Sequence, residues 1–345
     1  MTTVATVRGE VEAPLLGPTL MHEHIVNINA EVEKEFFDLA WTDDRERVLL
    51  GVVADLQQLK DSGIDTVVDC TAIGHGRDVE ALRFINERVD LHIVVCTGIY
   101  TYDHLPMFYE YKAAMEGRGG KVEDVLTTMF VRDLTEGIAG SGIRAALIKT
   151  ATDWLGVTPN VERVLRAVGR AHCETGAPIT THSVPALRNG LDQQRILAEE
   201  GVDLTKVVIG HSGDSTDLDY LRRLLDAGST IGADRFGLYL PDAGLPDMPS
   251  RLDTVSELCR LGYSGQIVLS HDVTCYADWL PPRFGPELAD WKLTHIPDSV
   301  VPALRQRGVT DDQLHEMLVG NPRRILGDGP TEDGPTAGGR TAGGR

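Results

Sequence analysis

Six side chains able to bind or bridge metal ions stand at the ends of apolar segments in this chain. Imidazole and carboxylate groups are ligands for first-row divalent metals. One catalytic zinc needs three protein ligands and an open position. The set contains four histidines and one aspartate besides a lysine, so it predicts two metal ions rather than one. The six residues are His22, His24, Lys149, His182, His211 and Asp272.

Lys149 is the unusual member of this set, because it ends the apolar segment AALIK. A buried ammonium group is costly, and an uncharged amine cannot bridge two cations. Reaction of the amine with carbon dioxide would give a carbamate, which is anionic and bidentate. We therefore expect Lys149 to be carboxylated and to bridge the two ions.

Short β-branched segments carry these residues, and amphipathic segments that end at glycine lie between them. Glycine is a common helix C-cap. Near-continuous apolar strands that alternate with helices are typical of a parallel sheet covered by helices. The expected strands are 19–24, 66–71, 92–98, 145–151, 178–183, 207–213, 229–235 and 267–272, and the expected helices include 45–60, 160–175, 192–200 and 217–227.

This alternation predicts an α/β fold, a (β/α)8 TIM barrel, formed by residues 1–326 as a single domain. The C-terminal ends of barrel strands meet at one mouth, where His22 and His24 would point the same way. An open doubly wound sheet is the alternative, but it more naturally carries a Gly-rich turn after its first strand. Residues 327–345 contain a duplicated TAGGR and no apolar anchor, so a disordered tail is expected.

The composition disfavours several classes of protein. The net charge of −19, from 33 basic and 52 acidic residues, opposes binding to nucleic acid or to anionic lipid. There is no apolar run of about 18 residues and no secretory signal pattern. The five cysteines are scattered without a C-x-x-C pair, which favours a reducing, cytoplasmic location. A serine hydrolase is disfavoured because G-x-S-x-G is missing.

Together, the motifs resemble the phosphotriesterase family of the amidohydrolase superfamily, and most of all its phosphotriesterase-like lactonases. The resemblance spans residues 5–326. The matching segments are TLMHEH (19–24), CTGIYTY (96–102), LIKTATD (147–153), ITTHS (179–183), GLDQQRILAEEGVDL (190–204), VVIGHSGD (207–214), GADRFG (232–237), LSHD (269–272) and NPRRIL (321–326).

The resemblance implies a binuclear metal centre at the C-terminal mouth of the barrel. His22, His24 and Asp272 would hold the more buried ion. His182 and His211 would hold the more exposed ion, and the carboxylated lysine and a hydroxide would bridge the two. Zinc is the expected metal, although cobalt, manganese and iron accept the same ligands. A homodimer is also implied.

The resemblance further implies four substrate-binding residues around the metals. Tyr100 matches a tyrosine that points at the metals in the lactonase branch. Arg235 matches a residue that shapes the entrance, and Trp279 matches an aromatic residue of the loop after strand 8. Packing at the mouth is the alternative role for these last two. Tyr102, from the same CTGIYTY segment as Tyr100, completes the set.

The implied function is a metal-dependent hydrolase that opens lactone rings. N-acyl-homoserine lactones, the substrates in quorum quenching, are the expected class, with promiscuous phosphotriesterase (paraoxonase) activity. The catalytic residues would be Lys149, Asp272 as proton acceptor, and Tyr100 as a hydrogen-bond donor to the lactone. A dedicated phosphotriesterase (aryldialkylphosphatase) or carboxylesterase with the same metal site is one alternative. A barrel without catalysis is another, and the complete ligand set argues against it. The loops 105–117, 183–190 and 238–251 line the expected pocket and leave the exact substrate open.

Overall fold

A computed structural model describes residues 2–102, 104–115, 120–240, 242, 244–281, 285 and 288–327. The tail predicted at 327–345 therefore lies outside the described residues, apart from Gly327. Across these ranges, no helix combines the length and the apolar character needed to span a membrane.

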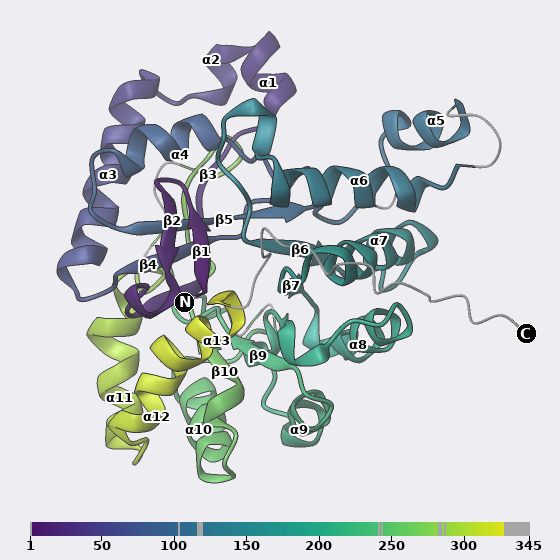
Figure 1. Ribbon diagram of the computed structural model, residues 1–345. Helices are drawn as coiled ribbons and strands as arrows, with labels where there is room; N and C mark the ends of the chain where they lie inside the picture. The colour runs from purple at the N-terminus through teal and green to yellow at the C-terminus, as the bar shows by residue number, and fades with distance from the viewer. Residues whose placement is uncertain are drawn as a thin grey trace, which may run out of the picture.

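The centre of the molecule is a sheet of parallel strands in the order β10-β9-β8-β7-β6-β5-β4-β3-β11, with helices arranged around it (Figure 1). The strands are β3 (Thr19–Asn27), β4 (Thr66–Asp69), β5 (His92–Gly98), β6 (Leu147–Ala151), β7 (Ile179–His182), β8 (Val207–Ile209), β9 (Thr230–Ala233), β10 (Ile267–Leu269) and β11 (Thr274–Ala277).

The helices alternate with these strands along the chain. They are α1 (Ala30–Glu35), α2 (Phe37–Ala40), α3 (Arg45–Asp61), α4 (Val79–Asn86), α5 (Met107–Met115), α6 (Val122–Thr135), α7 (Pro159–Thr175), α8 (Gly190–Glu199), α9 (Leu218–Asp226), α10 (Met248–Arg260), α11 (Val301–Gln306), α12 (Asp311–His315) and α13 (Asn321–Gly327).

The strands β10 and β11 are two halves of one barrel strand, and through them the sheet closes. β10 pairs with β9, whereas β11 pairs with β3, both in parallel. Between the halves, the Asp272 N–H donates to the His22 carbonyl at 3.0 Å, and the His24 N–H donates to the Val273 carbonyl at 2.8 Å. This closure confirms the predicted (β/α)8 barrel and excludes the open sheet.

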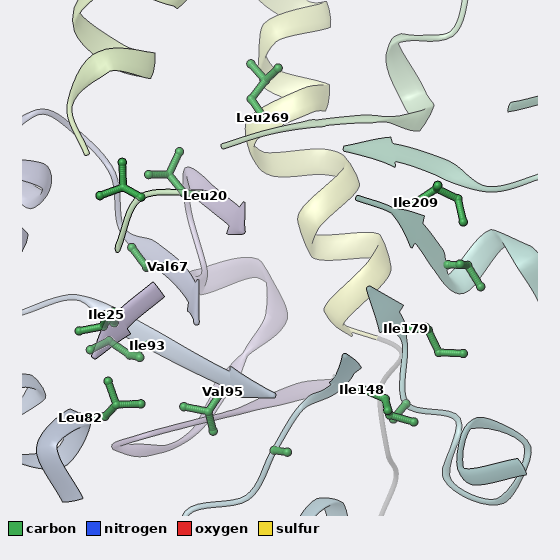
Figure 2. Close-up of a cluster of buried hydrophobic side chains, with 14 of the residues drawn as sticks. Leu20, Ile25, Val67, Leu82, Ile93, Val95, Ile148, Ile179, Ile209 and Leu269 are labelled. Atoms are coloured by element: carbon green, nitrogen blue, oxygen red, sulfur yellow. The ribbon is translucent and has the colours of Figure 1, made fainter. Parts of the chain in front are cut away.

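Outward-facing strand residues pack against the helices. Figure 2 shows this layer, in which Val67, Ile93, Ile148, Ile179 and Ile209 come from successive strands. Burying each such side chain contributes about 1.5–3 kcal/mol. A second cluster fills the barrel below the mouth, and its members include Met21, Val68, Val94, Val208 and Val268.

A register irregularity in β3 adjusts which residues face the barrel interior. The pairing of β3 with β4 shifts between Leu20 and Glu23. Leu20 and Ile25 both belong to the outer cluster, and Met21 belongs to the inner one. The shift therefore lets Met21 fill the inner core while His22 and His24 still point together toward the mouth, with ring centroids 5.6 Å apart.

The end of the barrel opposite the mouth is covered by the hairpin of β1 and β2 and by α13. β1 (Thr3–Thr6) and β2 (Gly9–Glu12) form an antiparallel hairpin. Val4, Leu16 and Ile325 belong to the cluster that fills the barrel, and in Figure 1 the hairpin and α13 lie across its centre. The sequence reasoning did not anticipate the hairpin.

Four predicted strands extend at least two residues past the C-terminal end of the observed strand, and the first of them, predicted at 66–71, ends at Asp69. The strand predicted at 207–213 ends at Ile209, the one at 229–235 ends at Ala233, and the one at 267–272 ends at Leu269. His211 and Asp272 follow these ends with φ of 62° and 57°, in the left-handed region. A strand cannot continue through that conformation, which non-glycine residues rarely adopt and which occurs frequently at active sites.

Candidate metal centre and active site

Asp234 orients two of the predicted ligand histidines. Its carboxylate oxygens lie 2.9 Å from His22 Nδ1 and 3.0 Å from His211 Nδ1. Burial by itself would raise the pKa of the Asp234 carboxyl, but His211 and His22 outweigh burial and hold that pKa far below its usual range. The ionised carboxylate accepts a hydrogen bond from each ring. Both Nε2 lone pairs are then available on the side of each ring away from Asp234.

The backbone around Asp234 is shaped to admit its carboxylate. A Cβ on Gly232 would overlap the Asp234 carboxylate, so this position of β9 requires glycine. The His211 N–H donates to Asp234 Oδ1 at 2.8 Å, which holds His211 in its left-handed conformation. The strain of that conformation, of order 1–3 kcal/mol, is offset by a buried hydrogen bond to a charged acceptor.

Three histidine Nε2 atoms converge on the carboxylate of Asp272. The Oδ1 atom lies 3.2 Å from His24 Nε2 and 3.5 Å from His22 Nε2, and Oδ2 lies 3.8 Å from His211 Nε2. The Thr71 hydroxyl lies 2.8 Å from His24 Nδ1 and fixes that ring. His22, His211 and Asp272 each offer a ligand atom within 4.8 Å of the others. This convergence has the form of a cation site.

Glu23 holds the break between β10 and β11, where Asp272 lies. Its buried carboxylate accepts hydrogen bonds from the Ser270 hydroxyl at 2.8 Å and from the His271 N–H at 2.9 Å. It also accepts from His271 Nδ1 at 2.7 Å and from the Val273 N–H at 2.8 Å. The glutamate between the two candidate ligand histidines of β3 therefore fixes the segment that carries the candidate ligand Asp272.

Lys149 reaches the centre of the mouth from β6. It is 1% exposed, and its Nζ lies 2.7 Å from His22 Nε2. The neighbouring strand β5 approaches β6 closely at Gly98, where a Cβ would overlap the Lys149 carbonyl. The lysine thus lies among the candidate ligand histidines, in contact with the imidazole of His22.

His182 supplies a buried nitrogen that lacks a hydrogen-bond partner. Its Nε2 is one of the unpaired buried polar atoms among the described residues. Its ring lies 4.6 Å from that of His211, and Asp153 Oδ1 lies 3.6 Å from Nε2. Burial lowers the pKa of His182 to about 4, so the ring is neutral near pH 7. A neutral, buried and unpaired imidazole nitrogen is suited to a metal ion.

Tyr100 lies beside the candidate ligand His182 and packs against an additional histidine. Its ring stacks on His75 at 4.5 Å and meets His182 edge to face at 5.5 Å. His75 in turn lies 4.5 Å from the ring of His24. Burial raises the pKa of Tyr100, so its hydroxyl is protonated near neutral pH. The sequence reasoning assigned no role to His75.

Arg235 contacts the site directly, whereas two other predicted substrate residues lie farther out. The Arg235 Nε donates to Asp272 Oδ2 at 2.9 Å. Tyr102 lines a separate pocket of about 480 Å³ beside Asn29. Trp279 follows β11, and its side chain is 62% exposed. The structure therefore groups Tyr100 and Arg235 with the candidate ligands and places Tyr102 and Trp279 toward the surface.

A pocket of about 190 Å³ opens beside His182 and Arg235. Apolar surface on its walls comes from Trp154, Pro185 and Leu245, which lie in three different loops. His182 and Arg235 provide polar groups on the same walls. A small ester could place its apolar part against these walls while its polar centre faces the histidines.

Comparison with known proteins identifies the family. The model of the phosphotriesterase family matches residues 2–326. The chain belongs to the phosphotriesterase family. The phosphotriesterase structure from Mycobacterium tuberculosis is 47% identical, with a TM-score of 0.88 over 95% of this chain and 99% of that one.

The chain is also similar to two proteins that are described by other activities. The aryldialkylphosphatase of Saccharolobus solfataricus is 35% identical over 92% of this chain and 98% of its own length. A structure from the molecular engineering of organophosphate hydrolysis activity from a weak promiscuous lactonase template is 34% identical. Its TM-score is 0.84, over 94% of this chain and all of that one. The protein is thus a metal-dependent hydrolase that acts on ester bonds.

The residues that sequence reasoning missed support the ligands rather than replace them. Asp234, Thr71 and Glu23 hydrogen-bond to ligand histidines or to the segment that carries Asp272. A signal existed for two of them, because Asp234 directly precedes Arg235 at a strand end and Glu23 lies between the histidines of H-E-H. For Thr71 the sequence offered no comparable signal.

Proposed function

We propose that this hydrolase opens lactone rings, with N-acyl-homoserine lactones as the substrate class and phosphotriesters such as paraoxon as secondary substrates. The observation that carries the proposal is the position of Tyr100. Its phenol ring lies against His182 and His75 at the edge of the candidate metal centre. A hydroxyl there could hydrogen-bond the ring oxygen of a lactone. The description of a related structure as a lactonase template supports the same assignment.

The donor set fits two divalent cations, for which we propose zinc first, with cobalt, manganese or iron as other metals. His22, His24 and Asp272 would hold one ion, and His182 and His211 the other. The His182 Nε2 atom supports this fit, because it is buried and has no hydrogen-bond partner among the described residues. Carboxylated Lys149 would bridge them, which would turn a buried amine into an anion among cations.

In the proposed reaction, the bound cations would lower the pKa of a water molecule and polarise the ester oxygen. Asp272 would accept the proton of the attacking water and pass it toward the leaving oxygen. Its pKa is well below its usual range, because His211, His22 and Arg235 outweigh the effect of burial, so it starts as a carboxylate. Arg235 holds Asp272 in place, and Tyr100 orients the lactone.

The competing proposal is a dedicated phosphotriesterase or carboxylesterase with the same metal site, which the related aryldialkylphosphatase favours. A panel of lactones of different ring size and acyl length, assayed beside paraoxon and an aryl ester on protein of measured metal content, decides between them. We expect higher kcat/KM for at least one lactone than for paraoxon. The reverse order across the whole panel would favour the phosphotriesterase.

We also propose a homodimer. Phe36, Phe37 and Leu39 of the α1–α2 region are 59%, 52% and 66% exposed. Apolar side chains clustered in this way are typical of an interface between subunits. Sedimentation equilibrium at micromolar concentration tests the proposal, and a single species with the monomer mass would contradict it.

A further inference from the structure

Arg251, near the start of α10, is a buried cation that belongs to neither the candidate ligands nor the predicted substrate residues. It is 2% exposed, and all three guanidinium nitrogens donate hydrogen bonds. Nε donates to the Pro246 carbonyl at 3.0 Å, and Nη2 donates to the Leu238 carbonyl at 3.0 Å. One side chain therefore holds both ends of the segment 238–246.

The third nitrogen connects Arg251 to the active site. Nη1 donates to Asp214 Oδ1 at 2.5 Å, and the other oxygen of Asp214 accepts from Arg235 Nη1 at 3.1 Å. Arg235 in turn donates to Asp272 Oδ2 at 2.9 Å. Two guanidinium groups and two carboxylates thus alternate from α10 to the candidate ligand, so each buried charge lies next to an opposite one.

Two residues next to Pro246, Gly244 and Leu245, are also part of the substrate pocket. Leu245 lines that pocket, and Asp214 and Arg235 line it too. A change at Arg251 would therefore act on the pocket wall and on the contact to Asp272 at once.

Charge alone does not explain Arg251. Buried ion pairs are weak sources of stability, and a guanidinium group keeps its proton and cannot relay one. The planar fork of arginine instead fixes several acceptors in one geometry, which the single ammonium of lysine cannot do.

We propose that Arg251 is a positioning residue that fixes the backbone at Leu238 and Pro246, beside the pocket-lining Leu245, and that it sets the position of Asp272 through Asp214 and Arg235. The inference deepens the proposed function and rests on it only for the choice of ester. Arg251, on an outer helix, would then determine the positions of both the substrate and the Asp272 carboxylate.

The test compares Arg251→Lys and Arg251→Gln with the control Arg260→Gln. Arg260 lies on the same helix, but it is exposed, and within the described part of the chain it pairs with Glu257. We expect both Arg251 variants to lose about 10- to 100-fold in kcat/KM for the best ester found, the range for residues that orient metal ligands. Amide hydrogen exchange in 238–246 should accelerate at least about tenfold. The control should match wild type in both measurements.

The lysine variant separates geometry from charge. If Arg251→Lys has the same kcat/KM as wild type, the proposal is overturned, because a positive charge at this position would then suffice. Exchange and kinetics of Arg251→Gln within about twofold of the control would also overturn it. If Arg251→Gln does not fold, Asp214→Asn breaks the same chain of contacts with an isosteric side chain and should reproduce both effects. Hydrogen exchange needs no substrate, so it tests Arg251 even if the enzyme opens no lactone.

Discussion

The floor and the rim of the barrel mouth are built differently. At the floor, each of three candidate ligand histidines is fixed by a second residue, Asp234 for His22 and His211, and Thr71 for His24. At the rim, Trp154 and Trp279 are 66% and 62% exposed. The floor comprises His22, His24, Lys149, His182, His211 and Asp272, and the rim comprises Tyr102, Trp154, Trp279, Gly244 and Leu245.

From this difference we infer that the floor sets the rate of the reaction and that the rim sets the preference among substrates. A preorganised floor stabilises developing charge whatever the ester is, because its groups do not need to reorient during the reaction. Exposed aromatic side chains at the rim select substrates by shape and hydrophobicity, and each side chain contributes little binding free energy. We therefore expect floor substitutions to reduce turnover of every substrate and rim substitutions to change the order of preference. Tyr100, between the two regions, should do some of both.

The largest effect should come from Lys149→Ala. Without the bridging group, both ions should bind more weakly, and activity toward lactone and phosphotriester should fall by about 1000-fold or more, the scale of losing the metal-activated water. Elemental analysis should find about two divalent ions per wild-type chain and fewer in the variant. Short carboxylic acids should partly restore activity by replacing the carbamate. Full activity of the variant without additives would exclude the bridging role.

Tyr100→Phe should have the next largest effect and should be selective. Lactone hydrolysis should fall by roughly 10- to 1000-fold, because one hydrogen bond to the reacting group is lost. Paraoxon turnover should change much less, since nitrophenolate leaves without assistance. Bound metal should stay at the wild-type level. Equal and mild losses for both substrates would mean that Tyr100 only packs against His75 and His182.

Asp234→Asn should lower all activities together by about 10- to 100-fold. An asparagine can accept from one imidazole N–H, but its amide NH2 would face the other, so His22 or His211 would lose its orientation. Parallel kinetics on lactone and paraoxon, with metal titration, measure this effect. Asp219→Asn, at an exposed position on α9, is the matched control. A selective loss for one substrate would contradict the division between floor and rim.

The smallest effect should come from Trp279→Ala. Loss of an exposed aromatic side chain should change KM by about two- to tenfold, with little change in kcat, and more for long acyl chains than for short ones. Kinetics across the lactone panel reveal the trend. If the loss of kcat equalled that of Asp234→Asn, Trp279 would contribute to the reaction itself, as the floor residues do.

The position of the candidate ligands in the fold could be predicted because the signal is local. A histidine, lysine or aspartate at the end of a β-branched run lies at the mouth of any barrel built from such runs. The family and the barrel followed from the same motifs. The strand ends at His211 and Asp272 were predicted wrongly, because hydrogen bonds to Asp234 and Glu23 hold these segments in conformations that strand propensity does not favour.

The sequence by itself determined the set of ligand types, their order along the chain, and the alternation of strand and helix that gathers them at one mouth. Only the tertiary structure decided how they are held. Asp234 meets His22 across 212 positions of the sequence, Glu23 meets His271 across 248, and Arg251 meets Asp214 across 37. The contacts of His22 and Glu23 form only when the later strands close the barrel on β3, and all three contacts depend on the register and the packing of individual elements. A local pattern records neither the register nor the closure, so it cannot contain these contacts.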